Sequence, residues 1–504
     1  MGTLFNRSNY RLYVLLASIL TSSILYQKVS NAIFVPKQLQ HIPKVNTLQW
    51  FWSVLIGESH DVRVKRLVLP IMNKYGLCLK YVMGNWTLTV ADPHYLQMLL
   101  KDMKSFPKIQ VAMDPDLILT NKAPSLSNCG MDDWKRQRSI ANPIFQRAMP
   151  VETFGNVVLK LFRSVDTLNQ DGVIDIADYA KRYALDCLGL GLFDFDMAAV
   201  SNPESYYSTL YKEAFSIVRD PLVYLFPAYT RIPSKWIPYR NRAQIANERL
   251  RKIFYEVIEE KKAAPSTSSD LLSLMIKANH SESDIAYLTD DELISNLSTF
   301  FVAGHETTAS AIASFFYYLA AHPDIQKKAR KEVLLILGDD PDDILPTDKQ
   351  LKQMTFLNYC IKETMRINPP TSGNLPRMTS RVILIGNFLI PKDTIVHLEL
   401  YCAHHLEKYW DRPEEFIPKR FDTASKNYRE NAVWMPFGYG PRTCIGLNFS
   451  LSEQRVLLAM MLKKFCWKLA PNSEHQHGLR NAHGGGIGLL GPESLKIQLI
   501  KRYA

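Results

Sequence analysis

The segment FGYGPRTCIG, residues 437–446, places a cysteine where it could bind or attack another atom. Cys444 lies between Gly440 and Gly446, in a loop with a tight turn that precedes a predicted helix start. Backbone N–H groups at such a position favour the thiolate, and Arg442 adds positive charge nearby. A thiolate of this kind could serve as a nucleophile, a redox sensor or a metal ligand.

These alternatives differ in what else the chain must supply. A cysteine nucleophile needs a histidine base nearby, and no cysteine-protease signature surrounds Cys444. The seven cysteines are scattered and form no CxxC pair, so neither a zinc ribbon nor a disulfide framework is supported. An axial thiolate on haem iron needs hydrogen bonds that temper the sulfur, and it supplies electron density that favours O–O cleavage. The loop fits this last alternative.

A second segment, AGHETT, begins at Ala303 and combines small, acidic and hydroxyl side chains. Ala303 and Gly304 leave room for a flat group near the backbone, and Thr307 can hydrogen-bond back to the Ala303 carbonyl. Glu306 supplies an ionisable proton carrier. We interpret the segment as a groove with a proton-delivery pair; the alternative is a hydroxyl-rich kink without chemistry. A zincin is excluded because Ala309 stands where HExxH requires its second histidine.

The AGHETT segment lies within an apolar run that predicts one long helix. Thr289 and Glu292 have the spacing of a capping box, and the run continues to Ala321. Such a helix has about 33 residues and a length of about 50 Å. Beyond Glu292 its only carboxylate is Glu306, and it contains no Lys or Arg. Because a carboxylate at mid-span is costly in lipid, we expect the axis of a large core rather than a membrane span.

The remaining patterns predict a mainly α fold with small β-sheets. Helical patterns dominate from residue 150 to 420, and strand-like runs occur at residues 86–90, 382–389 and 394–400. The chain has 504 residues and is 47% hydrophobic, enough for a large core. Its formal charge of +11 fits a solvated surface, or a basic face toward an acidic partner or an anionic membrane. No nucleic-acid motif is present, so nucleic acid is not an expected partner.

The N-terminal region predicts a membrane anchor. Residues 12–26 carry no charge and are bounded by Arg11 and Lys28. They are short for a span, and a signal peptide is the alternative, but no clear cleavage site follows. We therefore expect an anchor at residues 1–30, a linker with Pro36 and Pro43 at residues 31–45, and a catalytic domain at residues 46–504. A second apolar stretch, residues 222–237, is either a packed loop or a surface that dips into the membrane interface.

The cysteine loop resembles the haem-binding loop of the cytochrome P450 superfamily, with Phe437, Gly440, Arg442, Cys444 and Gly446 at the motif positions. Four further segments resemble family motifs in order and spacing: AGHETT the distal helix, ETMR from Glu363 the ExxR pair, FIPKRF the segment whose Arg420 joins that pair, and WKRQR from Trp134 the WxxxR helix. The resemblance covers residues 45–504. It implies one large haem domain behind the N-terminal membrane anchor helix.

The resemblance also implies the roles of individual residues. Cys444 is expected to be the proximal ligand of haem b iron, shielded by Phe437, and Ala303 is expected to border the porphyrin. Glu306 and Thr307 are expected to deliver protons during oxygen activation. The expected partners of the haem propionates are Trp134, Arg138, Arg377 and Arg442.

Two further groups of residues follow from the resemblance. Glu363, Arg366 and Arg420 are expected to be buried together and to shape the proximal core, so that their loss costs haem rather than specificity. Substrate contacts are expected from residues 109–126, 222–237, 300–308, 370–375 and 484–487. The apolar side chains in or beside these segments favour a lipophilic substrate; they are Leu117, Ile118, Leu119, Phe300, Phe301 and Leu375.

The implied reaction inserts one oxygen atom of O2 into a C–H bond and converts the other to water. The two electrons must come from outside, because no dinucleotide fingerprint is visible and the chain after Gly446 is too short for a fused flavin domain. The resemblance implies NADPH-cytochrome P450 reductase as the partner, with NADPH used only through it, and cytochrome b5 as a further partner. Lys135, Arg136 and Lys419 are candidates for docking the reductase. The expected location is the endoplasmic reticulum membrane, with the catalytic domain in the cytosol.

Two alternative functions remain at this point. One is a haem-thiolate isomerase or dehydratase that rearranges a peroxide and needs no reductase. The other is a membrane-anchored haem-binding protein without catalysis. The pair Glu306 and Thr307 favours activation of dioxygen over both.

Overall fold

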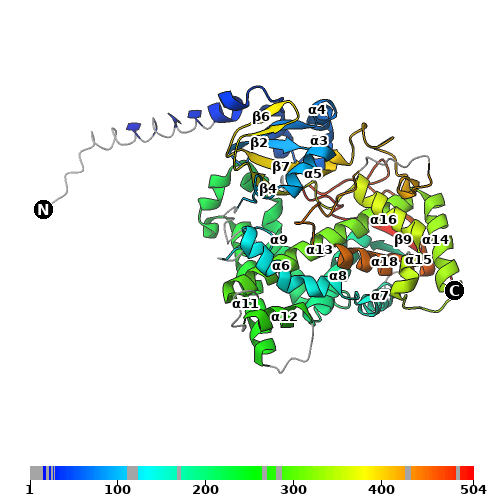
Figure 1. Ribbon diagram of the computed structural model, residues 1–504. Helices are drawn as coiled ribbons and strands as arrows, with labels where there is room; N and C mark the ends of the chain where they lie inside the picture. Colours follow the sequence, from blue (N-terminus) through cyan, green and yellow to red (C-terminus); the bar gives the residue numbers. More distant parts are fainter. Residues whose placement is uncertain are drawn as a thin grey trace.

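The computed structural model describes residues 29–109, 123–166, 172–263, 270–279, 287–425, 433–483 and 488–503, together with residues 15, 16, 18, 22, 23, 26 and 27. A large helical part and a smaller part built on a sheet lie side by side (Figure 1). Helix α13, Asp290–Ala321, runs through the middle of the helical part (Figure 1).

The helical part surrounds α13 with helices from both halves of the chain. The longer ones are α6 (Met131–Gln146), α7 (Val151–Asp166), α8 (Ile176–Leu188), α9 (Tyr206–Phe215), α11 (Pro238–Ala263), α12 (Leu271–Asn279), α14 (Pro323–Leu337), α16 (Thr355–Ile367) and α18 (Leu447–Lys464). Shorter elements are η2 (Gly189–Phe193), η3 (Ser216–Arg219), α10 (Pro221–Leu225), η4 (Pro227–Arg231), η5 (Ser234–Trp236), α15 (Asp348–Gln353), α17 (Leu400–Ala403) and η6 (Pro418–Phe421).

The larger sheet has the strand order β1-β2-β7-β4. Its strands are β1 (Leu77–Val82), β2 (Asn85–Val90), β7 (Ile395–Glu399) and β4 (Gly373–Met378). β2 pairs with β1 in an antiparallel hairpin and with β7 in parallel, and β4 is antiparallel to β7. A second sheet, β3-β9-β8, joins β3 (Val173–Asp175), β9 (Lys496–Lys501) and β8 (Phe465–Leu469), and β5 (Ile383–Ile385) pairs with β6 (Phe388–Ile390).

The N-terminal helices cover both faces of the larger sheet. They are η1 (Lys37–Leu39), α2 (Thr47–Leu55), α3 (His60–Leu67), α4 (Leu69–Tyr75) and α5 (Pro93–Lys101). Successive strand side chains point to opposite faces. Leu77 and Leu79 accordingly join the core that includes α5, whereas Cys78 joins the core of α2 to α4. The sheet is therefore a rigid platform that carries β4 toward the helical part.

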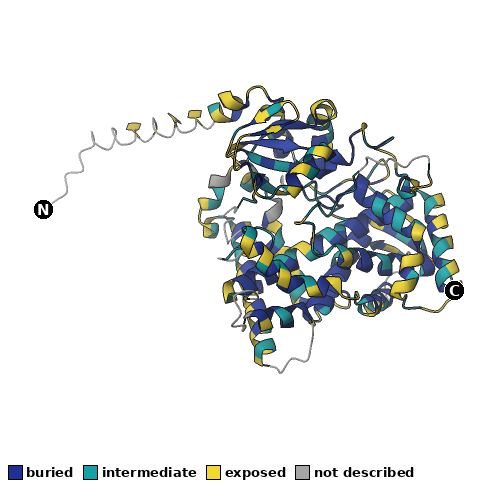
Figure 2. Cartoon of the chain, in the orientation of Figure 1, coloured by how far each residue is buried: buried dark blue, intermediate teal, exposed yellow. Residues whose placement is uncertain are grey.

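Helix α13 begins with the predicted capping box and forms the axis of the core. Glu292 N–H donates to Thr289 Oγ1 at 3.1 Å, and the Glu292 carboxylate accepts from Thr289 N–H at 3.0 Å. Most of the helix is buried against its neighbours (Figure 2). Gly304 allows the closest approach, because a Cβ added there would lie 2.6 Å from Leu188 Cδ1 of α8. The expectation of a core axis is confirmed.

The mainly α fold and two of the three expected strands are confirmed. Residues 86–90 and 394–400 correspond to β2 and β7. The run at 382–389 is instead divided between β5 and β6, because Gly386 has φ of +58° and turns the chain between them. Residues 222–237 form α10, η4 and η5, a series of short turns rather than one helix.

The predicted anchor, residues 1–30, lies largely outside the described residues. Within the described part of the chain, no helix combines the length and apolarity that crossing a bilayer requires. The predicted linker, residues 31–45, is described and leads directly into the larger sheet, where Val45 N–H donates to the Leu79 carbonyl at 2.9 Å.

Candidate functional site

The cysteine loop is a tight turn whose backbone requires glycine. Gly438 and Gly440 both have φ of +75°, a region in which residues with a Cβ are strained. A Cβ added at Gly440 would also lie 3.1 Å from the Leu100 carbonyl oxygen. Cys444 N–H donates to the Phe437 carbonyl at 2.9 Å and closes the turn. Helix α18 begins directly after the loop, so the cysteine stands before a helix N-terminus, as predicted.

The Cys444 thiol lies in an environment that on balance disfavours the thiolate. Its side chain is exposed, yet protein atoms surround it densely enough to displace much of the bulk water. This desolvation raises the pKa of Cys444, whereas a hydrogen bond from the Gly446 backbone and the charges of Arg138 and Lys108 lower it. The backbone donor expected from the sequence is therefore present but is outweighed by burial. A metal ion bound to the sulfur would deprotonate it outright.

Arg442 binds the backbone that precedes α6. The charges that lower the pKa of Cys444 therefore come from Arg138 and Lys108 and not from Arg442, which the sequence suggested. Arg442 Nη2 donates to the carbonyls of Cys129 and Gly130 at 3.0 and 3.2 Å. Its guanidinium lies 4.7 Å from the centre of the Trp134 ring, within cation–π range. The structure thus brings Arg442 and Trp134 together, as predicted.

Four cationic side chains, which we call the basic cluster, gather beside the cysteine loop. They are Lys108, Arg138, Arg377 and Arg442. Burial and then the charge of Arg442 lower the pKa of Lys108 to about 7 and that of Arg377 to about 10. Arg138 Nη1 donates to the Thr443 carbonyl at 3.1 Å. Within the described residues, no Asp or Glu is among the charges that shift the pKa of any of the four.

The basic cluster fits an anionic group with several oxygen atoms. Among the described residues, Arg377 Nε and Arg442 Nη1 are buried without a hydrogen-bond partner. Unpaired buried donors on cations are costly, and so is the mutual repulsion of the cluster. Carboxylates would satisfy both atoms and offset the repulsion. The two propionates of haem are such a group, so these residues fit the cofactor that the resemblance implies.

Lys108 is the member of the basic cluster that sequence reasoning missed. It belongs to no motif and reaches the site because it forms an antiparallel bridge with Arg377. Its Nζ donates to the Ser127 carbonyl. The only signal in the sequence was a basic residue beside the expected substrate segment, and a solvated surface lysine gives the same signal.

One face of α13 is left uncovered at the AGHETT segment. Ala303 is exposed, and Thr307 and Ser310 are half-buried, although the helix on both sides is buried. These residues, the uncovered strip, lie on one face because they are spaced by about one turn. Thr307 Oγ1 donates to the Ala303 carbonyl at 2.7 Å, as predicted. Thr308 Oγ1, next to the strip in sequence, lies 3.0 Å from Ser450 Oγ, so this segment of α13 packs on α18, the helix that follows the cysteine loop.

Glu306 lies next to this strip but within the protein. It is 8% exposed, and its Oε1 is 3.8 Å from His305 Nδ1. The Thr307 hydroxyl is exposed on the uncovered side, and Glu306 precedes it on the same turn of α13. A carboxyl and a hydroxyl in consecutive positions are the groups that a proton relay uses.

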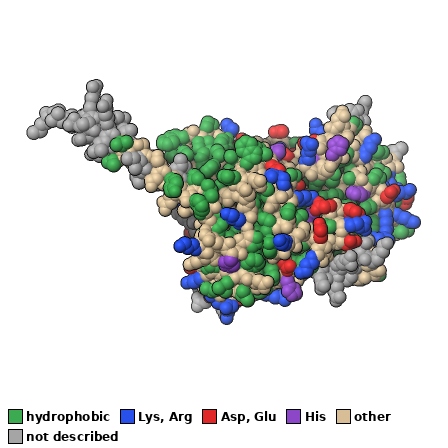
Figure 3. Space-filling view, turned by 90° about the horizontal axis from the view of Figure 1, so that it is seen from above, with side chains coloured by type: hydrophobic (Ala, Val, Ile, Leu, Met, Phe, Trp, Pro, Cys, Tyr) green, Lys and Arg blue, Asp and Glu red, His purple; other side chains and the backbone are tan. Residues whose placement is uncertain are grey.

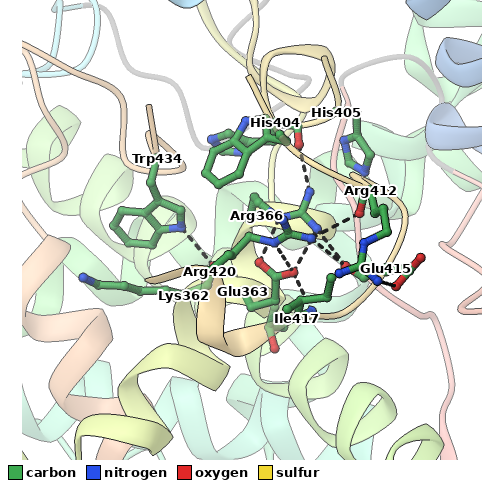
Figure 4. Close-up of polar contacts among 12 residues, drawn as sticks. Lys362, Glu363, Arg366, His404, His405, Arg412, Glu415, Ile417, Arg420 and Trp434 are labelled. Carbon is green, nitrogen blue, oxygen red and sulfur yellow. Dashed lines mark hydrogen bonds and ion pairs between the residues drawn. The ribbon is translucent and has the colours of Figure 1, made fainter. Parts of the chain in front are cut away.

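Glu363 is the centre of a buried ion pair network (Figure 4). Arg366 donates to both carboxylate oxygens, from Nε at 2.8 Å and from Nη2 at 3.0 Å. Arg420 Nε and the Ile417 N–H donate to Glu363 Oε1 at 2.9 and 2.8 Å. The remaining guanidinium donors bind carbonyl oxygens of residues 404, 411, 412 and 415. The expected grouping of Glu363, Arg366 and Arg420 is present, and it ties α16 to the segment before the cysteine loop.

The expected substrate contacts are only partly within the described residues. Leu117, Ile118, Leu119 and residues 484–487 lie outside them. Phe301 is buried and packs with Tyr211 and Phe254, on a face of α13 other than the uncovered strip. Leu375, at 40% exposed, presents an apolar side chain from β4.

The chain matches known proteins over nearly its whole length. A sequence profile of the family described as "Cytochrome P450" matches residues 43–496. The chain is 28% identical to cytochrome P450 3A41 of Mus musculus over 97% of this chain and 96% of the relative. It is also 28% identical to cytochrome P450 3A7 of Homo sapiens, over 79% of this chain and 80% of the relative, and to cytochrome P450 3A12 of Canis lupus familiaris, over 82% and 84%.

Proposed function

The chain belongs to the cytochrome P450 family and is a haem-thiolate monooxygenase, and on that premise we propose that Cys444 is the cysteine that binds the haem iron. The observation that carries this assignment is the pairing of the glycine-shaped Cys444 loop with a basic cluster that has no carboxylate partner in the described chain. Haem, when bound, supplies the activation of O2. The protein must hold it, orient the substrate and move protons.

The basic cluster holds the propionates in this proposal. Arg377 Nε and Arg442 Nη1 offer donors that have no partner among the described residues, and Arg138 and Lys108 contribute positive charge. Trp134 stacks on Arg442 and fixes the direction of its guanidinium. Ala303, with no side chain beyond Cβ, lets a flat macrocycle lie against α13, and Phe437 closes the sulfur side.

Glu306 and Thr307 handle protons in this proposal. The Thr307 hydroxyl donates to the Ala303 carbonyl, so its oxygen lone pairs point to the uncovered strip and can accept a proton from a donor there. Glu306 lies one residue before it and connects the strip with the interior of the protein. A carboxyl and a hydroxyl in sequence form a relay in which the carboxyl reloads the hydroxyl after each transfer.

The substrate is a lipophilic small molecule, and the electrons come from NADPH through a separate reductase, with cytochrome b5 as a second donor. The proposed docking residues are Lys135, at 66% exposed, and Lys419, which is exposed. Arg136 is removed from this set, because it forms ion pairs with Glu292 and Asp133 at 2.6 and 3.0 Å and is only 20% exposed. The charge of Arg136 is therefore neutralised by acidic residues of the same chain.

A membrane location is supported by one exposed apolar surface. Hydrophobic side chains gather near the N-terminal end of the described chain (Figure 3). The surface comprises exposed residues of α2 and the chain around it, and of the segment after α10, the helix that contacts α2; they are Phe34, Leu48, Trp52, Leu55, Ile56, Phe226 and Trp236. Beside an anchor at residues 1–30, such a patch would let the catalytic domain, residues 46–504, rest on the cytosolic face of the endoplasmic reticulum membrane, with only the apolar side chains of the patch entering the interface.

The test of this function is turnover of the purified holoenzyme in lipid vesicles with a panel of lipophilic compounds. Compounds that shift the haem absorption band on binding are incubated with NADPH and the reductase, and oxygen uptake and hydroxylated product are measured. The proposal expects product only when NADPH, reductase and O2 are all present. Conversion of a hydroperoxide without reductase, and none with NADPH, would assign the chain to the isomerase alternative. If neither NADPH-dependent product nor conversion of a hydroperoxide is found, the chain would be a haem-binding protein without catalysis.

A further inference from the structure

His305, between the small residues and the acid of the AGHETT segment, is buried at the contact of α13 with α8. It is 3% exposed. Its Nε2 lies 2.9 Å from the Lys181 carbonyl oxygen of α8. The close approach of α8 at Gly304 brings this carbonyl within reach. His305 is thus attached to a second helix, whereas its neighbours Glu306 and Thr307 belong to the proton pathway proposed above.

The hydrogen bond to Lys181 determines the tautomer of His305. A carbonyl oxygen only accepts, so Nε2 must carry the hydrogen. Burial lowers the pKa of His305, so the ring is neutral and Nδ1 holds a lone pair. Among the described residues Nδ1 is buried and has no hydrogen-bond partner. An acceptor is therefore held inside the protein with nothing yet assigned to it.

The group that this acceptor faces is Glu306. Its Oε1 lies 3.8 Å from His305 Nδ1, about one ångström beyond a hydrogen bond, a gap that a small side-chain rotation closes. The imidazole itself cannot turn away, because the Tyr211 ring of α9 packs edge-on at 4.5 Å between centres. Phe301 of α13 packs against Tyr211, and Phe254 of α11 packs against Phe301. The movable partner of the pair is the carboxyl.

We propose that His305 is a positioning residue that docks the protonated form of Glu306: the acid O–H donates to His305 Nδ1 while it waits, and swings to the uncovered strip when Thr307 has lost its proton. No proton moves to His305 in the docked state, so no charge is created in the interior. A neutral acid finds an acceptor at Nδ1, whereas an ionised carboxylate meets a lone pair there. The docking site therefore accepts a hydrogen bond from the acid O–H and offers no donor to a carboxylate.

The other groups that face His305 do not supply this acceptor. The charges that act on it are Glu306, on its own helix, and Lys181, on α8. From α9 it meets the ring of Tyr211, and no further charged group acts on it from the described parts of α11 or α18. A docking role therefore depends on Glu306, whereas a purely structural role of His305 does not.

The test uses His305→Gln, Glu306→Gln and the double variant in the holoenzyme. Glutamine can keep the donor toward the Lys181 carbonyl and lacks the ring nitrogen that faces Glu306. Infrared spectra of the resting ferric proteins, recorded without turnover, report the band of the protonated carboxyl. We expect this band, assigned by its loss in Glu306→Gln, to weaken and shift in His305→Gln. The ratio of product to NADPH should fall about threefold.

The double variant separates docking from support of the fold. If His305 acts through Glu306, the coupling of the double variant equals that of Glu306→Gln alone. Additive losses, or an unchanged carboxyl band in His305→Gln, would overturn the proposal. His305→Asn places a polar atom near the former Nδ1 and should restore part of the coupling that His305→Gln loses. If His305→Asn restores no coupling and the losses in the double variant are additive, His305 has a structural role instead. Because this inference rests on the proposed function, a normal coupling ratio in Glu306→Gln would refute the proton relay, while the infrared band still reports on docking.

Discussion

Arg420 Nε lies 2.9 Å from Glu363 Oε1, although 57 residues separate the two in the sequence. Both side chains are buried, and Arg366 donates to both oxygens of the same carboxylate. One negative charge thus serves two guanidinium groups, and the backbone carbonyls around them complete the network (Figure 4). The network anchors the segment that leads into the cysteine loop.

We predict that Glu363→Gln destabilises the fold by about 3–5 kcal/mol, because it leaves two buried guanidinium groups without a counter-charge. The expected product is apoprotein or aggregate, and the measurement is haem per polypeptide in the purified protein together with the midpoint of urea unfolding. Arg412→Ala is the matched control, since Arg412 is 51% exposed and its ion pairs among the described residues are with Asp411 and Glu415, at 39% and 55% exposed. It should change stability by less than about 0.5 kcal/mol. Full haem occupancy in Glu363→Gln would refute this structural role.

Much of this network could be predicted from the sequence, and other parts of the site could not. The spacing of Glu363 and Arg366 within one helical turn, the glycines around Cys444 and the capping box of α13 are local patterns, and each is found as expected. Lys108 joins the basic cluster through a bridge to Arg377. Contacts over such distances depend on how strands and helices pack, and no local pattern encodes them.

The same distinction explains the details that the sequence misjudged. Arg442 is two residues from Cys444, but its guanidinium is held by Cys129, Gly130 and Trp134. Although Arg442 is close to Cys444 in the sequence, its charge is therefore not among those that act on the Cys444 sulfur. Likewise, burial raises the pKa of Cys444 despite the helix N-terminus, because desolvation depends on surrounding elements that the loop sequence does not contain.

The relay predicts that Thr307→Ala lowers the ratio of product to NADPH by about threefold or more, with the missing electrons appearing as hydrogen peroxide. Haem content should remain normal, because the hydrogen bond that the Thr307 hydroxyl forms within the described chain is to a carbonyl of its own helix. Thr308→Val is the matched control: Thr308 is buried against Ser450 and faces away from the strip, so coupling should stay near the native value. Equal coupling in Thr307→Ala and the native enzyme would show that the hydroxyl is not part of the relay.

A buried histidine beside the Glu363 network predicts loss of stability in acid. Burial and the charge of Arg366 lower the pKa of His404 from 6.5 to about 3. The unfolded chain therefore binds this proton before the folded chain does, and stability falls as pH drops from 6.5 toward 3, by about 1.4 kcal/mol per pH unit at most. His404→Gln should flatten this part of the curve, because Gln Oε1 can accept the Met435 N–H that His404 Nε2 accepts at 3.0 Å.

The measurement for His404 is the free energy of unfolding from urea titrations at several pH values. The exposed His94, changed to Gln, serves as control and should leave the acid limb of the curve unchanged. An acid limb of the same slope in the native protein and in His404→Gln would show that other groups account for the loss of stability.

The apolar surface predicts how the catalytic domain meets a membrane. Trp52 of α2 and Trp236 of η5 are 65% and 69% exposed. Replacing both with Glu in protein that lacks residues 1–30 should lower binding to phosphatidylcholine vesicles about tenfold, because apolar area no longer enters the interface. Leu335→Glu is the control, as Leu335 is 79% exposed on α14, which lies far from the sheet strands β2 and β6 in Figure 1. Vesicle flotation that is equally strong in all three proteins would exclude this surface.

The central assignment, Cys444 as the ligand of haem iron, is tested most directly by the reduced carbon monoxide spectrum of Cys444→Ala. The native protein should show the band characteristic of a thiolate ligand. In Cys444→Ala that band should be absent, with either no haem bound or the spectrum of a non-thiolate complex, while Cys129→Ala, changed at a buried cysteine beside Arg442, should keep the native band. A thiolate band that survives in Cys444→Ala would contradict the account.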